Sequence, residues 1–244
     1  MEHPYLIQNL KSKIQNRDGF TLIELLVVVA IIAILVGLIV PALGQARKQS
    51  GQVVCASNLK NIGMAFDYYR QDYRDIYPCA NDPVHSVKNW WLWMGRGFRP
   101  VLEPYIAPNL SAKNPNVLWC PQDPSPENKY ENTSYAYAMS FYHSSTQINS
   151  MNDKSFTYSN PKPGVAVSSG KVTFPARKIL AGEWLSAHQS IAGADPGWWG
   201  WLGTRNFVFA DGHAEFVPSR KIRPANDNLP DPNLTIDGVE GTDL

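Results

Sequence analysis

The chain has 244 residues, with 22 Lys and Arg against 21 Asp and Glu, which gives a formal net charge of +1. This balance, with no arginine-rich stripe, excludes the usual electrostatic signature of a nucleic-acid-binding protein, so we expect no nucleic acid as a partner. The length is sufficient for one good-sized domain or two small ones.

Composition divides the chain into five segments. They are a polar leader (1–19), an apolar transmembrane helix (20–43), an amphipathic second half of that helix (44–75), a globular β-rich head (76–223) and a tail (224–244). The tail carries five acids and no basic residue. This composition predicts a mobile acidic extension.

The apolar segment predicts a membrane-spanning helix. Leu22–Val40 would form roughly 28 Å of helix, which matches a bilayer core of about 30 Å. A secreted protein cut after Ala46, in the small-residue sequence "GQA", is the alternative. Glu24 argues against that alternative, because an acid has no purpose in an apolar segment that is discarded.

Beyond the apolar run the sequence predicts that the helix continues to about Tyr73. Apolar residues recur three or four positions apart and form one stripe, made of Cys55, Leu59, Ile62, Phe66, Tyr69 and Tyr73. Pro41 should bend this helix, because proline lacks a backbone donor and clashes with the preceding turn.

The sequence "GFTLIELLVVVAIIAIL" places an acid, Glu24, shortly after a Gly–Phe junction. This motif resembles the N-terminus of type IV pilins and type II secretion pseudopilins. The resemblance implies that a prepilin peptidase cuts between Gly19 and Phe20 and then methylates the new amino group of Phe20. Pro41 also stands where that family usually has a helix-bending proline.

The same resemblance implies a location and a set of partners. The protein would cross the bacterial inner membrane once, with its N-terminus cytoplasmic and its head extracytoplasmic, and then enter a periplasmic pseudopilus or a cell-surface pilus. Its partners would be prepilin peptidase, other copies of itself or other pilins, the inner-membrane assembly machinery and membrane lipid. Basic residues are almost equally frequent on both sides of the span, so charge alone does not orient it.

Glu24 is an acid within an apolar span, where a charge is costly unless it is paired. The free amine of Phe20 in a neighbouring subunit would supply the opposite charge after cleavage. Such a pair would set the axial register of a filament, and assembly would wait for processing. The alternative is that Glu24 points toward water or lipid headgroups at the membrane surface.

Three further stretches, "CASNLKNIGMAFDYYRQDY", "LWCPQDP" and "NFVFADGHAEFV", resemble a group of pilin-like proteins known mainly from planctomycete and verrucomicrobial genomes. Those proteins usually carry a histidine ten residues before an Asp-Gly pair. Asp211, Gly212 and His213 match that group, but Trp201 stands at the place of the histidine.

The head should consist of short strands and turns, since most of the 19 prolines and 17 glycines lie within it. Stretches with β-prone residues near alternation occur at 117–124, 134–143, 164–174, 178–184 and 206–219. The last predicts a hairpin around Asp211-Gly212, with Phe207 and Phe209 on one face and Val208 on the other. We therefore expect an α+β, pilin-like fold with a small antiparallel sheet packed on the helix.

The chain has three cysteines, Cys55, Cys79 and Cys120. Cys55 lies on the apolar stripe, and Cys120 begins a turn after a predicted strand, so we favour a Cys55–Cys120 disulfide over Cys79–Cys120. Three reduced, buried thiols are the alternative. No two cysteines have CxxC spacing and no histidine cluster accompanies them, which argues against a zinc site.

The sequence gives little support to catalysis. The five histidines are scattered, and neither HExxH nor G-x-S-x-G is present, so we expect no enzyme and no cofactor. Some pseudopilins hold calcium in a loop of the head. A calcium site here would use oxygen atoms of Glu183, Asp195 and Asp211.

Six of the eight tryptophans lie in two clusters, "WWLW" at 90–93 and "GWWGW" at 197–201. Trp198, Trp199 and Trp201 are candidates for an exposed platform that stacks on a sugar ring or contacts a neighbouring subunit. Burial in the core is the alternative.

These observations favour a structural filament subunit. The main alternative is a single-span, membrane-anchored binding module whose tryptophan-rich head binds carbohydrate. A membrane-tethered enzyme has the least support.

Overall fold

The computed structural model describes residues 19–79, 95–106, 117–123, 133–158, 163–189, 191 and 195–244. Residues 1–18 of the predicted leader and the tryptophan cluster at 90–93 lie outside these ranges. The helices and strands are α1 (Leu22–Asp72), α2 (Gly95–Ile106), β1 (Tyr135–Tyr137), α3 (Ser145–Asn149), α4 (Ser155–Tyr158), β2 (Ile179–Glu183), β3 (Thr204–Phe209) and β4 (Ala214–Pro218). The chain divides into two compact units between Gln45 and Ala46.

Helix α1 has 51 residues and continues through Pro41 without interruption. Among the described residues it is the one helix that is long and apolar enough to cross a membrane, and its apolar window is wholly exposed in the isolated chain. Its second half has a buried stripe as predicted, since Cys55, Leu59 and Ile62 are fully buried.

The sheet has four antiparallel strands in the order β1-β2-β3-β4. The predicted hairpin is confirmed: Val208 pairs with Ala214, and Gly212 has a φ of +86° in the turn between them. A positive φ is easily adopted by glycine, which has no Cβ. The small sheet and the long N-terminal helix together give the expected α+β, pilin-like fold.

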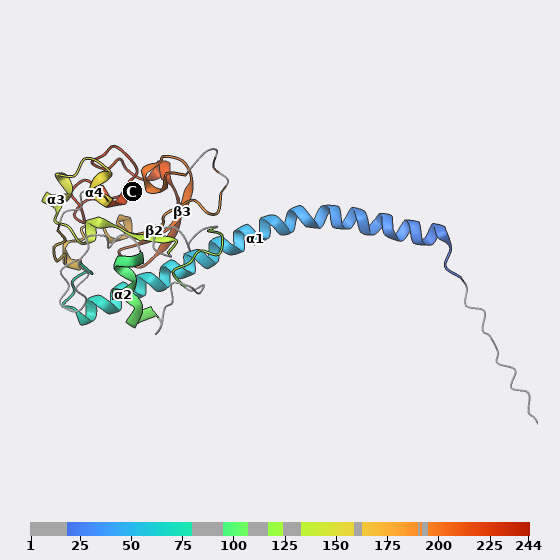
Figure 1. The fold of residues 1–244 in the computed structure, drawn as a ribbon, viewed down its shortest axis with the longest axis horizontal. Helices are drawn as coiled ribbons and strands as arrows, with labels where there is room; N and C mark the ends of the chain where they lie inside the picture. The colour runs from blue at the N-terminus through green and yellow to red at the C-terminus, as the bar shows by residue number, and fades with distance from the viewer. Residues whose placement is uncertain are drawn as a thin grey trace, which may run out of the picture. The chain divides into compact units, whose positions relative to one another are not determined.

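The second half of α1, α2 and the sheet form one core in the head (Figure 1). The ring of Phe66 on α1 lies 4.6 Å from that of Tyr137 on β1 and 6.4 Å from that of Phe98 on α2. Every residue of β3 is buried, because both of its faces are covered. Val208 faces Gly63 of α1, whereas the ring of Phe207 contacts Trp198 on the opposite side.

Two of the predicted strands are absent from the residues that the structure describes. Residues Val117–Trp119 form a turn, and the stretch at 164–174 contains a 3₁₀ turn (Ser169–Lys171) and a single bridge between Ile76 and Ser168. Prolines next to the first stretch remove ladder donors, and the Ser-Ser-Gly sequence of the second favours a turn over a strand.

The tail is also different from the prediction of a mobile extension. Asp243 is buried, forms an ion pair of 3.2 Å with the buried ammonium of Lys178, and accepts a hydrogen bond of 2.7 Å from the backbone N–H of Ile179. Asp231 and Leu234 are buried as well. The tail has no cation of its own, but Lys178 of the head pairs with Asp243 and so helps to hold the tail against the head.

Candidate assembly segment and the polar cluster of the head

Gly19 and Phe20 precede α1, separated from it by Thr21, and both are exposed. The side chain of Phe20 has 75% of its surface accessible. A Cβ added to Gly19 would have no heavy atom within 4 Å. Among the described residues, none covers the predicted cleavage junction.

Glu24 closes a capping box at the start of α1. Its Oε2 accepts hydrogen bonds of 2.9 Å from both the backbone N–H and the Oγ1 of Thr21, and its own N–H donates to that Oγ1 at 3.2 Å. This is the reciprocal S/T-x-x-E arrangement, which satisfies backbone donors that no helical carbonyl can reach. The sequence "TLIE" carries the local signal for this cap, which was not among the predicted features.

The helix that follows presents apolar side chains in every direction. Leu22, Ile23, Leu38 and Val40 each keep more than 60% of their surface accessible in the isolated chain. Monomeric soluble proteins rarely expose apolar patches of more than a few hundred Å². This part of α1 therefore requires a covering from outside the chain, such as lipid or other helices.

In the head a disulfide joins Cys55 of α1 to Cys120, with the Cα atoms 5.3 Å apart. Cys79 is buried and is not part of this bond. Asn58, one turn further along α1, donates to the carbonyl oxygen of Trp119 at 3.1 Å and to the Tyr135 hydroxyl at 3.3 Å. The helix is thus fixed covalently and by hydrogen bonds to the segment around Cys120.

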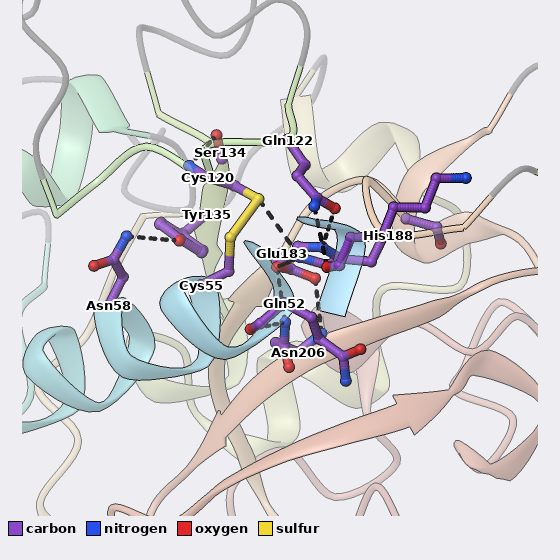
Figure 2. Close-up of polar contacts among 12 residues, drawn as sticks. Gln52, Cys55, Asn58, Cys120, Gln122, Ser134, Tyr135, Glu183, His188 and Asn206 are labelled. Carbon is purple, nitrogen blue, oxygen red and sulfur yellow. Dashed lines mark hydrogen bonds and ion pairs between the residues drawn. A yellow bond between two sulfur atoms is a disulfide. The ribbon is translucent and has the colours of Figure 1, made fainter. Parts of the chain in front are cut away.

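A buried polar cluster lies beside the disulfide (Figure 2). Nε2 of His188 lies 2.7 Å from Oε1 of Glu183 and 3.5 Å from Sγ of Cys120. Asn206 of β3 donates to Glu183 from its backbone N–H at 2.8 Å and from its Nδ2 at 3.0 Å. Gln122 accepts from Nδ1 of His188 at 2.7 Å.

The three tryptophans do not form one exposed platform. Trp198 is buried and donates from its indole nitrogen to the carbonyl oxygen of Glu183 at 2.8 Å. Trp199 is half-buried and donates to Oδ2 of Asp231 at 3.0 Å. Of the three side chains only Trp201, at 41% accessible, is exposed. Partners for the two indole N–H groups, supplied by β2 and the tail, explain why this glycine-flanked cluster turns inward.

The proposed calcium ligands are likewise kept apart. Asp195 forms an ion pair of 2.6 Å with Arg205, and Asp211 accepts from the ring of His213 at 2.5 Å in the exposed hairpin turn. Glu183 belongs to the polar cluster, which contains neither of these two aspartates. The three carboxylates therefore do not converge on a common calcium ion.

These features agree with a comparison between the N-terminal part of the chain and known protein families. Residues 14–40 match the family described as "Prokaryotic N-terminal methylation motif". That match covers the Gly19–Phe20 junction, Glu24 and most of the apolar run. It supports a membrane-anchored protein of the pilin and pseudopilin class.

Individual relatives also belong to secretion and pilus systems. The chain is 40% identical over 86 residues to the "Type II secretion system core protein G" of Pseudomonas aeruginosa, covering 31% of this chain and 60% of that protein. It is 43% identical over 58 residues to the "Type IV wide pilus major component PilA4" of Thermus thermophilus, covering 24% of this chain and 44% of that protein. The chain thus spans about half the length of the curated relatives it matches. No solved structure matches.

Proposed function

We propose that this chain is a prepilin that is cleaved between Gly19 and Phe20, methylated at Phe20 and polymerised through its N-terminal helix into a type IV pilus-like or type II pseudopilus filament. The observation that carries the proposal is the exposed, all-round apolar helix directly behind an open Gly–Phe junction within a prokaryotic methylation motif. The head would serve as the outward face of the filament.

Processing is compatible with the capping box. Cleavage after Gly19 turns the nitrogen of Phe20 into a free amine, but it leaves Thr21 and its backbone N–H in place. A carboxylate has roughly four lone-pair sites, so Glu24 can accept from a neighbour's amine while it still caps its own helix. The capping and pairing roles of Glu24 are therefore not exclusive.

The first experiment is intact-mass and N-terminal peptide mass spectrometry of the full chain, expressed in a bacterial membrane together with a prepilin peptidase. We expect a chain that begins at N-methylated Phe20. A chain that still begins at Met1 would indicate the membrane-anchored binding module, and a chain that begins after Ala46 would indicate a secreted protein. Either result would reject the proposal.

Gly19→Val tests the junction, and Gly37→Val is its matched control, because a Cβ at either position would meet no atom within 4 Å. We expect Gly19→Val to block cleavage and Gly37→Val to be processed like the wild type. Equal processing of the two variants would show that the peptidase does not require Gly19 for cleavage.

Two substitutions separate the charge of Glu24 from its cap. Glu24→Gln removes the charge but can keep the capping box, because Gln also serves at this position. Thr21→Val removes the capping hydroxyl but keeps the charge. We expect Glu24→Gln to abolish recovery of sheared filaments, whereas Thr21→Val only reduces it. Normal filaments from Glu24→Gln would contradict the pairing with the Phe20 amine.

A further inference from the structure

We infer that Cys55, Cys120, Glu183 and His188 form a site for a zinc-like divalent metal ion when the two cysteines are reduced. The ion would tie α1 to the head at the place where the disulfide ties it after oxidation. This inference concerns only the head and does not depend on the proposed processing of the N-terminus.

The four potential ligand atoms already converge. All of them lie within 4.8 Å of one another, and all four residues are buried. A tetrahedral zinc ion with ligands at about 2.0–2.3 Å places neighbouring ligand atoms roughly 3.3–3.8 Å apart. Sγ of Cys120 and Nε2 of His188 are 3.5 Å apart, and Oε1 of Glu183 is 2.7 Å from that nitrogen. Reduction would let the sulfurs separate, so small movements suffice.

An outer hydrogen bond from Nδ1 orients the ring of His188 with Nε2 toward the other ligand atoms. Nε2 of Gln122 donates to the helix carbonyls of Arg47 at 2.9 Å and Lys48 at 3.0 Å. The oxygen of the same amide therefore faces His188, and Nδ1 donates to it at 2.7 Å. The lone pair of Nε2 in a neutral imidazole then points toward Glu183 and Cys120 (Figure 2). Ligating histidines usually have this kind of outer hydrogen bond.

Glu183 is oriented in a similar way. Oε2 accepts from the N–H of Asn206 at 2.8 Å, and Oε1 accepts from its Nδ2 at 3.0 Å, which leaves lone pairs on Oε1 for a cation. Oε1 of Glu183 and Nε2 of His188 face each other at 2.7 Å. A metal ion between them would accept one electron pair from Oε1 and one from Nε2.

The ligand chemistry selects the metal. Two thiolates, an imidazole and a carboxylate suit zinc or cobalt, whereas calcium and magnesium prefer oxygen atoms alone. Binding would exchange the protons of two thiols for the metal, with no electron transfer. A small disulfide oxidant would then take two electrons from the thiolates: its S–S bond breaks to give two thiolates, which take protons from water, while Cys55 and Cys120 bond to each other and the metal leaves.

The test uses the full chain in detergent micelles, reduced with a phosphine under anaerobic conditions and titrated with Co²⁺ and then Zn²⁺. We expect one Co²⁺ per reduced chain, with the intense absorption of tetrahedral thiolate-bound cobalt, and its displacement by Zn²⁺. The oxidised chain should not produce this signal. Zn²⁺ should also raise the melting temperature of the reduced chain, since a ligand of the folded state stabilises it.

Four variants locate the ligands. His188→Gln and Glu183→Gln should each weaken Co²⁺ binding by at least about tenfold. His213→Gln and Glu215→Gln change a partly exposed histidine and an exposed glutamate of the β3–β4 hairpin, and these variants should bind as the wild type does. No stoichiometric uptake by the reduced wild type would overturn the inference. Equal binding by His188→Gln and His213→Gln would overturn it too, because it would indicate adventitious thiolate binding only.

X-ray absorption at the zinc edge keeps the test decisive even if a ligand variant fails to fold. The reduced, zinc-loaded wild type should show two sulfur and two nitrogen or oxygen ligands. Four sulfur ligands would indicate cross-linking between chains, and a zinc ion without sulfur ligands would indicate a different site. Both results contradict the assignment.

Discussion

The two halves of α1 belong to one continuous helix, but their apolar side chains are treated differently. In the first half, Leu35 and its neighbours are about half accessible, whereas Leu59 and Phe66 in the second half are fully buried by the chain's own head. The second half has a stripe, which one sheet can cover. The first half is apolar all round, so only lipid or several neighbouring helices can cover it. The comparison shows which surface must find its partner outside the chain.

The largest expected effect is loss of the disulfide that holds the second half to the head. Cys120→Ala should lower the free energy of unfolding of the oxidised head by about 4 kcal/mol, since the bond closes a separation of 65 residues. Denaturant unfolding of the full chain in micelles, followed by tryptophan fluorescence, measures this loss. Cys79→Ala is the control and should cost only about 1–2 kcal/mol. Equal losses would show that the bond contributes little beyond packing.

A pair of leucine substitutions compares the two halves directly. Leu59→Ala should destabilise the head by about 3 kcal/mol, because it leaves a cavity under the sheet. Leu35→Ala should leave head unfolding unchanged, because Leu35 belongs to the other compact unit and is not a member of the head core. The same denaturant titration measures the free energy of unfolding of both variants. An equal loss for Leu35→Ala would mean that the two halves unfold as one unit.

Asp231 in the tail should make the stability of the head depend on pH. Burial, with Asp227 as a secondary cause, raises the pKa of Asp231 to about 7. An unfolded aspartate titrates near 3.9, so between about pH 4 and pH 7 the folded chain holds a proton that the unfolded chain has lost. Stability should therefore fall as the pH rises through this window, by up to about 1.4 kcal/mol per unit. Asp231→Asn should remove this component.

Unfolding free energies at pH 5 and pH 7.5 measure that difference. Glu215→Gln, at an exposed position of β4, should keep the wild-type dependence on pH. If Asp231→Asn keeps it as well, Asp231 is ionised in the folded head and the pairing of the tail must be reinterpreted.

The smallest expected effect comes from two glycines of α1. A Cβ at Gly63 would lie 2.9 Å from Cγ2 of Val208, whereas a Cβ at Gly37 would meet nothing. Gly63→Ala should lower the melting temperature of the head by a few degrees, since the helix and β3 must separate slightly. Gly37→Ala should leave it unchanged. A stabilised Gly63→Ala variant would show that Val208 can move aside and that helix propensity decides.

Much of the fold could be predicted because its signals are local. The 3–4 spacing of the stripe fixed which face of α1 is buried, and Asp211-Gly212 fixed the hairpin turn. The strands predicted at 117–124 and 164–174 failed, because β-prone residues do not form a strand without a neighbouring edge to pair with. The capping box of Thr21 and Glu24 is also local and was readable.

The head's polar cluster could not be read in the same way. Cys55, Cys120 and His188 come from a helix, an irregular segment and a turn that are far apart in the sequence, so neither CxxC spacing nor histidine spacing marks them. Burial of Trp198 likewise depends on a carbonyl of β2, which lies in a different segment of the sequence.

The sequence by itself determined the long helix, its apolar first half, the methylation motif and the hairpin, because hydrophobic period and turn chemistry are properties of neighbouring residues. Only the tertiary structure decided that the acidic tail is packed, that two of three tryptophans turn inward and that an acid and an imidazole converge on the disulfide. Those outcomes depend on which distant donors and cations satisfy each buried polar group, and that choice is made only when the segments meet.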